Sequence, residues 1–223
     1  MSVKRYLGFL IQRLYLNLKK LRINFFIPIV IADVFLPIIC CMTYKSETAN
    51  IMFDQTVMEF SMVIIPLCSV WWAVFINRDY VEGMGNELLF VCKSKIKLID
   101  TFLSYLLFFA VTITQFALYI NWEEALKSEP LKLLIISFFY YCAVQFFAFL
   151  TQSIAITLFV VLCYTIINVI SSASAEIIFF PLYFDTSPLS AETFLYQYLP
   201  MLIVSLLLLG ASIYINKKRL KFN

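Results

Sequence analysis

Apolar residues occur along this chain in long blocks that contain few charges, and most polar residues lie between the blocks. A helix needs about 20 largely apolar residues to cross a hydrocarbon core roughly 30 Å thick. Six blocks meet this standard and predict six transmembrane helices, at about residues 24–43, 60–77, 98–120, 131–150, 153–170 and 198–215. The predicted fold class is therefore an all-α membrane protein in which residues 24–223 form a six-span domain.

The segment before the first block, residues 1–23, carries apolar side chains at helical spacing. These are Leu7, Leu10, Ile11, Leu14, Leu18 and Leu21. Three basic residues, Arg13, Lys19 and Lys20, lie away from that stripe. The pattern predicts an amphipathic helix in the interface of the inner leaflet, and a solvated targeting arm is the alternative.

The stretch before the last block, residues 171–197, has a different character. It contains three acidic residues, no basic residue and an apolar core at residues 177–184 that Pro181 interrupts. This core is too short to cross a bilayer. Irregular backbone at membrane depth is tolerated only against protein or a wet cavity, so we expect this loop to be partly inserted at the outer face.

Composition and charge support this topology. Of the 223 residues, 62% are hydrophobic and 14% are charged, against about 45–50% apolar and about 25% charged in soluble domains. Of the 17 basic residues, 14 fall in residues 1–23, 78–97 and 216–223, and the other three are Lys45, Lys127 and Lys132. Because Lys and Arg collect on the cytoplasmic side, this split predicts a multi-pass protein of the cell membrane with both termini in the cytoplasm.

The residue patterns of common enzyme chemistry are missing from the sequence. The chain has no histidine, no C-x-x-C pair and no G-x-x-x-x-G-K-[ST] phosphate loop. It therefore lacks the commonest metal ligand, the usual base at neutral pH and a common means of holding a nucleotide. We expect no catalytic residue, no metal site and no cofactor in this chain. We also expect no nucleic-acid partner, because the basic residues lie at the membrane flanks.

The loop between the second and third blocks, residues 79–95, carries the most specific pattern. In order, it contains Glu82, Gly83, Glu87, Leu88, Leu89, Val91 and Cys92, then a polar and basic corner at Ser94 and Lys95. This order resembles the first cytoplasmic loop of ABC transporter permeases of the type 2 export class, in which it forms a short coupling helix. The resemblance extends to the interfacial helix, the six spans and the partly inserted outer segment.

The resemblance implies a permease subunit that forms half of a translocation route beside a second permease subunit, identical or related. Separate ATP-binding cassette ATPase subunits would hold ATP and magnesium. The apolar side chains of the 79–95 loop would contact the ATPase, and Glu82 and Glu87 would pair with basic residues at the rim. The alternative is a helix that only lies on the membrane. Small bacterial permeases of this kind expel antimicrobial peptides, so the implied substrate is such a peptide or another amphipathic compound.

Three polar residues inside the blocks are candidates for lining the route. Asp33 lies near the middle of the first block, where an ionised side chain costs roughly 2.5–3.5 kcal/mol, so we expect it to face the bundle interior. Gln115 and Gln145 lie in the third and fourth blocks. The alternative for all three is a structural hydrogen bond to a neighbouring helix. Pro28 and Pro37 flank Asp33 and predict a kinked first span.

Two other functions fit a chain of this size. A vitamin importer uses a membrane-embedded substrate-binding subunit that can also have six helices. Such a subunit needs faces of small residues to dock its partner, whereas this chain has only four glycines. A membrane scaffold or assembly factor without transport activity is the second alternative.

Overall fold

The computed structural model describes residues 3–46, 53–82, 94–122, 127, 129–172 and 189–219. Almost all of these residues are helical, and none of them lies in a strand. In chain order the elements are α1 (Val3–Leu21), the 3₁₀ turn η1 (Arg22–Phe25), α2 (Phe26–Val30), the π-helical turn η2 (Ile31–Phe35), α3 (Leu36–Ser46), α4 (Phe53–Val81), α6 (Ser94–Trp122), α7 (Glu129–Thr151), α8 (Ile154–Ser172), α9 (Ala191–Thr193), the π-helical turn η4 (Phe194–Tyr198) and α10 (Leu199–Arg219). The predicted all-α fold is confirmed.

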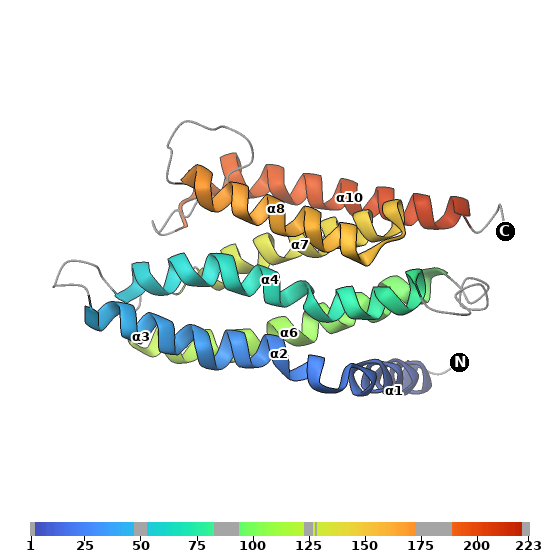
Figure 1. Ribbon diagram of the computed structural model, residues 1–223, viewed down its shortest axis with the longest axis horizontal. Coiled ribbons are helices and arrows are strands. Elements are labelled where there is room, and N and C mark those ends of the chain that lie inside the picture. Colours follow the sequence, from blue (N-terminus) through green and yellow to red (C-terminus); the bar gives the residue numbers. More distant parts are fainter. Residues whose placement is uncertain are drawn as a thin grey trace.

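Consecutive long helices run in opposite directions along one common axis (Figure 1). The stretch from α2 to α3 leads away from α1, α4 returns, and the chain alternates in this way through α10. The ends of α4, α7 and α10 and the starts of α6 and α8 therefore lie at the same end of the bundle as α1. We call this the α1 end of the bundle, and it comprises α1, Val81, Ser94, the turn at residues 151–154, and Arg219.

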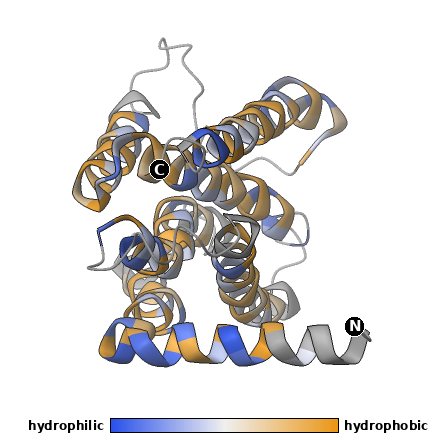
Figure 2. Cartoon of the chain, turned by 90° about the vertical axis from the view of Figure 1, so that its right-hand side faces the viewer, coloured by the Kyte–Doolittle hydropathy of each residue, from blue (hydrophilic) through white to orange (hydrophobic). Residues whose placement is uncertain are grey.

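The first helix, α1, lies across the bundle rather than along it. Figure 1 views α1 nearly end-on, while Figure 2 shows it at full length against helices that are themselves seen end-on. The chain changes direction at Arg22, whose φ of 52° lies in the left-handed region that non-glycine residues adopt rarely. α1 packs against α4 and α6. This orientation suits an interfacial helix, whose place in a membrane stays a prediction.

Four helical stretches of the described chain are long and apolar enough to cross a membrane, namely Leu10–Ile39, Val57–Val81, Glu129–Thr151 and Phe194–Lys218. Two shorter apolar stretches, Leu98–Thr114 and Ile154–Val169, lie within α6 and α8. These coincide with the third and fifth predicted spans. The protein therefore has the helices of a membrane protein, and the count of six depends on α6 and α8. Most of the predicted outer loop at 171–197 lies outside the described residues.

The buried side chains form two clusters that meet at α4. One joins α4 to the segment from η1 to α3 and to α6. At its Trp72, the indole ring stacks on Phe25 at 4.9 Å and meets Phe108 edge-on at 5.8 Å. The Trp72 indole also donates to the Phe25 carbonyl at 3.1 Å. The other cluster joins α4 to α7, α8 and α10, with Tyr140 and Tyr141 at its centre. Because α7 packs against α4, α8 and α10, it is the most enclosed helix of this second group.

Candidate functional site

One of the predicted coupling residues is described by the structure, and it lies at the α1 end. Only Glu82 falls within the described residues, directly after α4. The others, which are Gly83, Glu87, Leu88, Leu89, Val91 and Cys92, lie outside them. Their contact with an ATPase stays a prediction.

Glu82 connects the end of α4 to the start of α8. Its Oε1 accepts a hydrogen bond of 2.7 Å from the backbone N–H of Ile154, the first residue of α8. A helix start has unpaired N–H groups and a partial positive charge, so a carboxylate is stabilising there. The second oxygen of Glu82 lies 3.8 Å from Nε of Arg78, one turn back on α4. The carboxylate therefore caps α8 from a different helix, a role that the sequence did not indicate.

The turn that presents Ile154 to Glu82 is short and specific. Gln152 has a φ of 53°, in the left-handed region, which reverses the chain between α7 and α8. Ser153 follows as the N-cap of α8, with its Oγ 3.5 Å from the N–H of Ile156. Thr151 Oγ1 accepts from the Ser153 N–H at 3.3 Å. The α8 start is thus held by two caps, one local and one from α4.

A second contact at the α1 end is an ion pair between α1 and α6. Arg13 donates to Oδ2 of Asp100 at 2.5 Å, and the Tyr80 hydroxyl donates to the same oxygen at 3.0 Å. The Asp100 side chain is 1% exposed and that of Arg13 is 24% exposed. Arg13 therefore faces the bundle, although the sequence put it away from the apolar face of its helix. Asp100 was not singled out from the sequence; the available signal was a charge two residues inside the third block.

An exposed ion pair also joins α1 to α4. Lys20 Nζ lies 2.7 Å from Oδ2 of Asp79, and both side chains are largely accessible. On the outward side of α1, Ile11, Tyr15 and Leu16 are more than half exposed. The apolar stripe of α1 is thus divided between a bundle-facing side and an outward side. An in-plane helix with such an outward side can contact lipid while it stays attached to the bundle.

Asp33 lies in the π-helical turn η2, between Pro28 and Pro37. The predicted irregularity in this span is therefore a π turn, a feature often found at functional positions. η2 packs against α4 and α6, and Asp33 is half-buried between the packed residues Ala32 and Leu36 and the exposed Val34. Its Oδ1 is shielded from solvent and accepts no hydrogen bond from the described residues. The structural hydrogen bond considered above is thus not seen for this oxygen.

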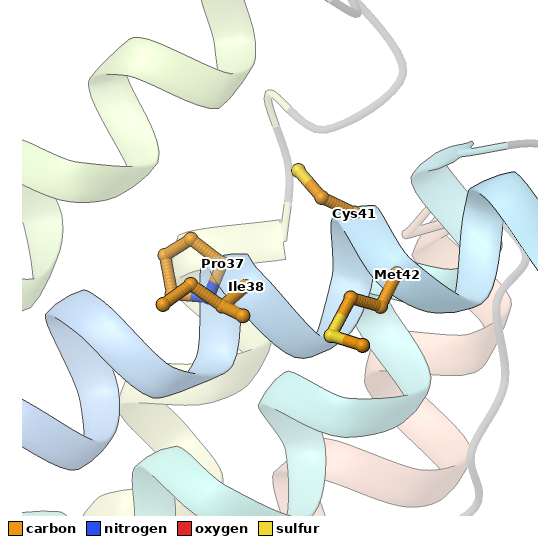
Figure 3. A pocket seen from close by; sticks show the side chains of 4 residues that line it. All are labelled: Pro37, Ile38, Cys41 and Met42. Carbon is orange, nitrogen blue, oxygen red and sulfur yellow. The ribbon is translucent and has the colours of Figure 1, made fainter.

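A shallow groove of about 270 Å³ lies on α3, beyond Asp33 toward the opposite end of the bundle (Figure 3). Pro37, Ile38, Cys41 and Met42 line it, all from one helix. Its surface is almost entirely apolar. A specific site for a polar ligand combines an enclosed space with convergent polar groups, and this groove offers neither.

Gln145 lies in the last third of α7 and is fully buried. Neither its amide nitrogen nor its amide oxygen has a hydrogen-bond partner in the described part of the chain. The same is true of two other buried amides, Asn77 on α4 and Asn216 on α10. The side chain of Gln115 on α6 is not among those that the structure describes. Of the predicted route residues, Asp33 packs with the Trp72 cluster, whereas Gln145 lies among residues of the Tyr140 cluster.

At the opposite end of the bundle, α7 begins with a buried ion pair. Lys132 Nζ lies 3.0 Å from Oε1 of Glu129, with side-chain exposures of 1% and 3%. Glu129 lies in the first turn of α7, where negative charge is favoured. The sequence predicted that Lys132 lies on the outer side of the membrane, and it did not predict that the side chain is buried in the protein.

Among the described residues, no group of three His, Cys, Asp or Glu side chains is arranged to hold a metal ion. Comparison with models of protein families, with curated proteins and with solved structures finds no match to this chain.

Proposed function

We propose that this chain is the permease subunit of an ATP-driven exporter, with six spans and both termini in the cytoplasm. The length of α6 and α8 supports the count. At 1.5 Å per residue, the 29 residues of α6 and the 19 residues of α8 extend about 43 Å and about 28 Å, close to or beyond the hydrocarbon thickness. Alternating helix directions then bring α1 and the end of α10 to one side of the membrane.

Basic residues support the orientation in which the α1 end is cytoplasmic. Arg13, Lys19 and Lys20 on α1 and Lys217 and Lys218 on α10 all belong to this end. Lys and Arg are enriched in cytoplasmic segments that flank spans. The described basic residues at the opposite end are Lys45, Lys127 and Lys132, and the last of these is buried beside Glu129.

One observation carries the functional proposal: Glu82, at the end of α4, also caps the start of α8. The segment that follows it, residues 83–93, joins α4 to α6 in sequence. A displacement of this segment by a partner would therefore act directly on α4 and α6 and, through Glu82, on α8. A rigid shift of one group of helices against another is a common way to alternate access to a route.

In this proposal, separate ATPase subunits hydrolyse ATP with magnesium and bind the 83–93 segment through Leu88 and Leu89. A second permease subunit, identical or related, completes the route. The substrate class is an antimicrobial peptide or another amphipathic compound. The absence of histidine and of a phosphate loop from the sequence is the reason to assign hydrolysis to a partner.

The proposal is tested by purifying the tagged protein from its native membrane together with its ATPase. Leu88→Asp combined with Leu89→Asp should release the ATPase and lower hydrolysis to the level of the ATPase alone. Lys217→Asp combined with Lys218→Asp is the control, because it adds two acidic groups at the same end of the bundle but leaves the segment intact. Normal assembly and normal hydrolysis in the double leucine variant would contradict the proposal, as would the absence of any copurifying ATPase.

A further inference from the structure

The corner between α1 and the first span collects basic side chains. Lys19 and Lys20 lie in the last turn of α1, and Arg22 is the first residue of η1, where the chain changes direction. Residues 3–32 contain no acidic residue, so positive charge is concentrated in this part of the chain. We call residues 19–30 the elbow.

The basic side chains of α1 and the elbow differ in their partners. Lys20 pairs with Asp79 of α4, as Arg13 does with a carboxylate of α6, so both hold α1 to the bundle. Lys19 and Arg22 are exposed, and neither forms an ion pair with a carboxylate of the described residues. Two cationic groups of the elbow are therefore available to a partner outside the protein.

The exposed side of α1 leads to the elbow. Its exposed residues recur at intervals of three and four, namely Gly8, Ile11, Gln12, Tyr15, Leu16 and Lys19. Leu18 and Leu21 lie on the other side and pack into the Trp72 cluster. The Lys19 ammonium lies 6.0 Å from the centre of the Tyr15 ring. Apolar side chains, an aromatic ring with a polar tip and a cation are the groups that occupy the boundary between hydrocarbon and headgroups.

An exposed apolar stripe continues from the elbow along the first span. Ile23, Phe26, Val30 and Val34 are 76%, 60%, 39% and 48% exposed. Their spacing of three and four residues puts them on one side of the helical segment that runs from η1 to η2. At 1.5 Å per residue, the stripe is about 16 Å long, close to one leaflet of a hydrocarbon core roughly 30 Å thick. The stripe therefore has the length to accompany an acyl chain through one leaflet.

Other spans at the α1 end also have exposed apolar residues, but they differ in charge. On α8, Ile156 and Phe159 are exposed, and the turn before this helix, residues 151–153, carries no charge. Lys217 and Lys218 lie in the last turns of α10, where the helix dipole already favours positive charge. In the elbow, an in-plane helix, two available cations and an apolar stripe occur in consecutive residues.

We propose that the elbow binds an anionic phospholipid of the inner leaflet, with its phosphate at Lys19 and Arg22 and one acyl chain along the exposed stripe. Basic groups beside a span attract anionic headgroups, and a guanidinium can hold two phosphate oxygens at once. A lipid in this position contacts both α1 and the first span, so it stabilises the angle between them. This inference rests on the proposed topology and not on the exporter function.

The first test titrates the purified protein, in a neutral detergent, with dioctanoyl phosphatidylglycerol or dioctanoyl phosphatidylcholine. Phosphatidylglycerol should raise the thermal midpoint more, because it binds the folded protein. Lys19→Gln combined with Arg22→Gln should weaken this binding about 30-fold, since each basic group beside an anionic headgroup contributes about fivefold. Lys217→Gln combined with Lys218→Gln is the matched control, with the same change of charge at the same end, and it should leave the titration unchanged.

Three outcomes of this titration would overturn the site. Equal responses to the two lipids would show that the headgroup charge is not recognised. Loss of the response in both double variants would assign it to the overall charge of the α1 end. An equal rise with sodium phosphate alone would show that the anion is bound without its lipid.

The second test locates the acyl chain by tryptophan fluorescence. Phe26→Trp puts an indole on the stripe, and Phe159→Trp puts one at an exposed position of α8. These positions lie about 6 Å and about 8 Å along their helices from Arg22 and Ile154, so their depths are similar. The unsubstituted protein supplies the background of its own tryptophans.

The bilayers for this test contain the same fraction of phosphatidylglycerol, with bromine on the acyl chains either of that lipid or of an equal amount of phosphatidylcholine. Brominated phosphatidylglycerol should quench the Phe26→Trp protein more strongly, whereas the two lipids should quench the Phe159→Trp protein equally. Equal quenching of the Phe26→Trp protein by both lipids would contradict the proposal. If no ATPase copurifies but the elbow still selects phosphatidylglycerol, the exporter function fails while the lipid site stands.

Discussion

Two regions of the α1 end treat buried polar groups in opposite ways. Where α1, α4 and α6 meet, the buried carboxylate of Asp100 receives both Arg13 and Tyr80. On α4, α7 and α10, the buried amides of Asn77, Gln145 and Asn216 receive no bond from the described chain. The charge is the costlier group to bury, and it is paired through one of its two oxygens, while the neutral amides have no partner among the described residues. The first region therefore attaches α1 to the bundle, whereas the amides make no such contact between helices.

The largest effect is expected at Asp100. Asp100→Leu leaves Arg13 without its partner, and the loss of one member of a buried pair costs about 3–5 kcal/mol. The thermal midpoint should fall strongly, and Arg13→Leu combined with Asp100→Leu should restore most of it. A double variant as unstable as the single variant would show that the pair is not what holds α1 to α6. Tyr80→Phe, which removes only the second donor, should cost about 1 kcal/mol.

Asp33 tests whether a shielded oxygen without a hydrogen-bond partner has a function. Asp33→Asn removes an ionisable group at membrane depth, whose cost is roughly 2.5–3.5 kcal/mol when it is charged. We expect unchanged or higher stability together with impaired transport, measured as export of a labelled substrate by cells that express equal amounts of protein. The control is Glu59→Gln at an exposed position of α4. Normal export by the Asp33 variant would end its candidacy as a route residue.

The cap that Glu82 provides for α8 should have an intermediate effect. Glu82→Ala removes the acceptor for the Ile154 N–H and should cost about 0.5–2 kcal/mol in a thermal or denaturant unfolding experiment. Glu82→Gln keeps a side-chain oxygen and should cost less. If the cap also transmits movement to α8, ATPase activity that depends on the permease should follow the same order. Equal effects of alanine and glutamine would indicate that the charge, and not the cap, matters.

The smallest effect is expected for the exposed pair of Lys20 and Asp79. Solvated ion pairs contribute about 0.2–1 kcal/mol and are weakened by salt. Lys20→Met should therefore shift the thermal midpoint only slightly, and the shift should disappear at high ionic strength. A loss as large as that of Asp100→Leu would remove the distinction between the two contacts of α1.

The sequence was sufficient for the helices but not for their mutual contacts. Block length and apolar content predicted the long helices, because these properties are local. The pairing of Arg13 with Asp100 joins residues 87 positions apart, and the cap of Ile154 by Glu82 joins residues 72 apart. Neither contact follows from periodicity, since each depends on how separate helices pack.

The candidate site was predicted in part for the same reason. Gln145 was selected as a polar residue within an apolar block. A search for all such residues would also have found Asn77, at the end of the second block, but not Asn216, which lies one residue beyond the sixth. What the sequence could not supply is which of these amides have partners. Asn168, for example, donates to the Tyr164 carbonyl of its own helix at 2.7 Å, so an equally polar residue has a different status.

The left-handed turn at Arg22 has a consequence for depth. At Arg22 the chain leaves the direction of α1 and enters the helical segment that runs from η1 to α3. Asp33 follows 11 residues later. At 1.5 Å per residue, Asp33 lies about 16 Å from Arg22 along this segment. This distance is about half the thickness of a hydrocarbon core of roughly 30 Å. A single residue inserted or deleted between the two would change the level of the carboxylate by about 1.5 Å and rotate it by about 100° around the helix. With α1 in the membrane interface, as predicted, the turn at Arg22 therefore sets both the depth of the Asp33 carboxylate and the direction in which it points.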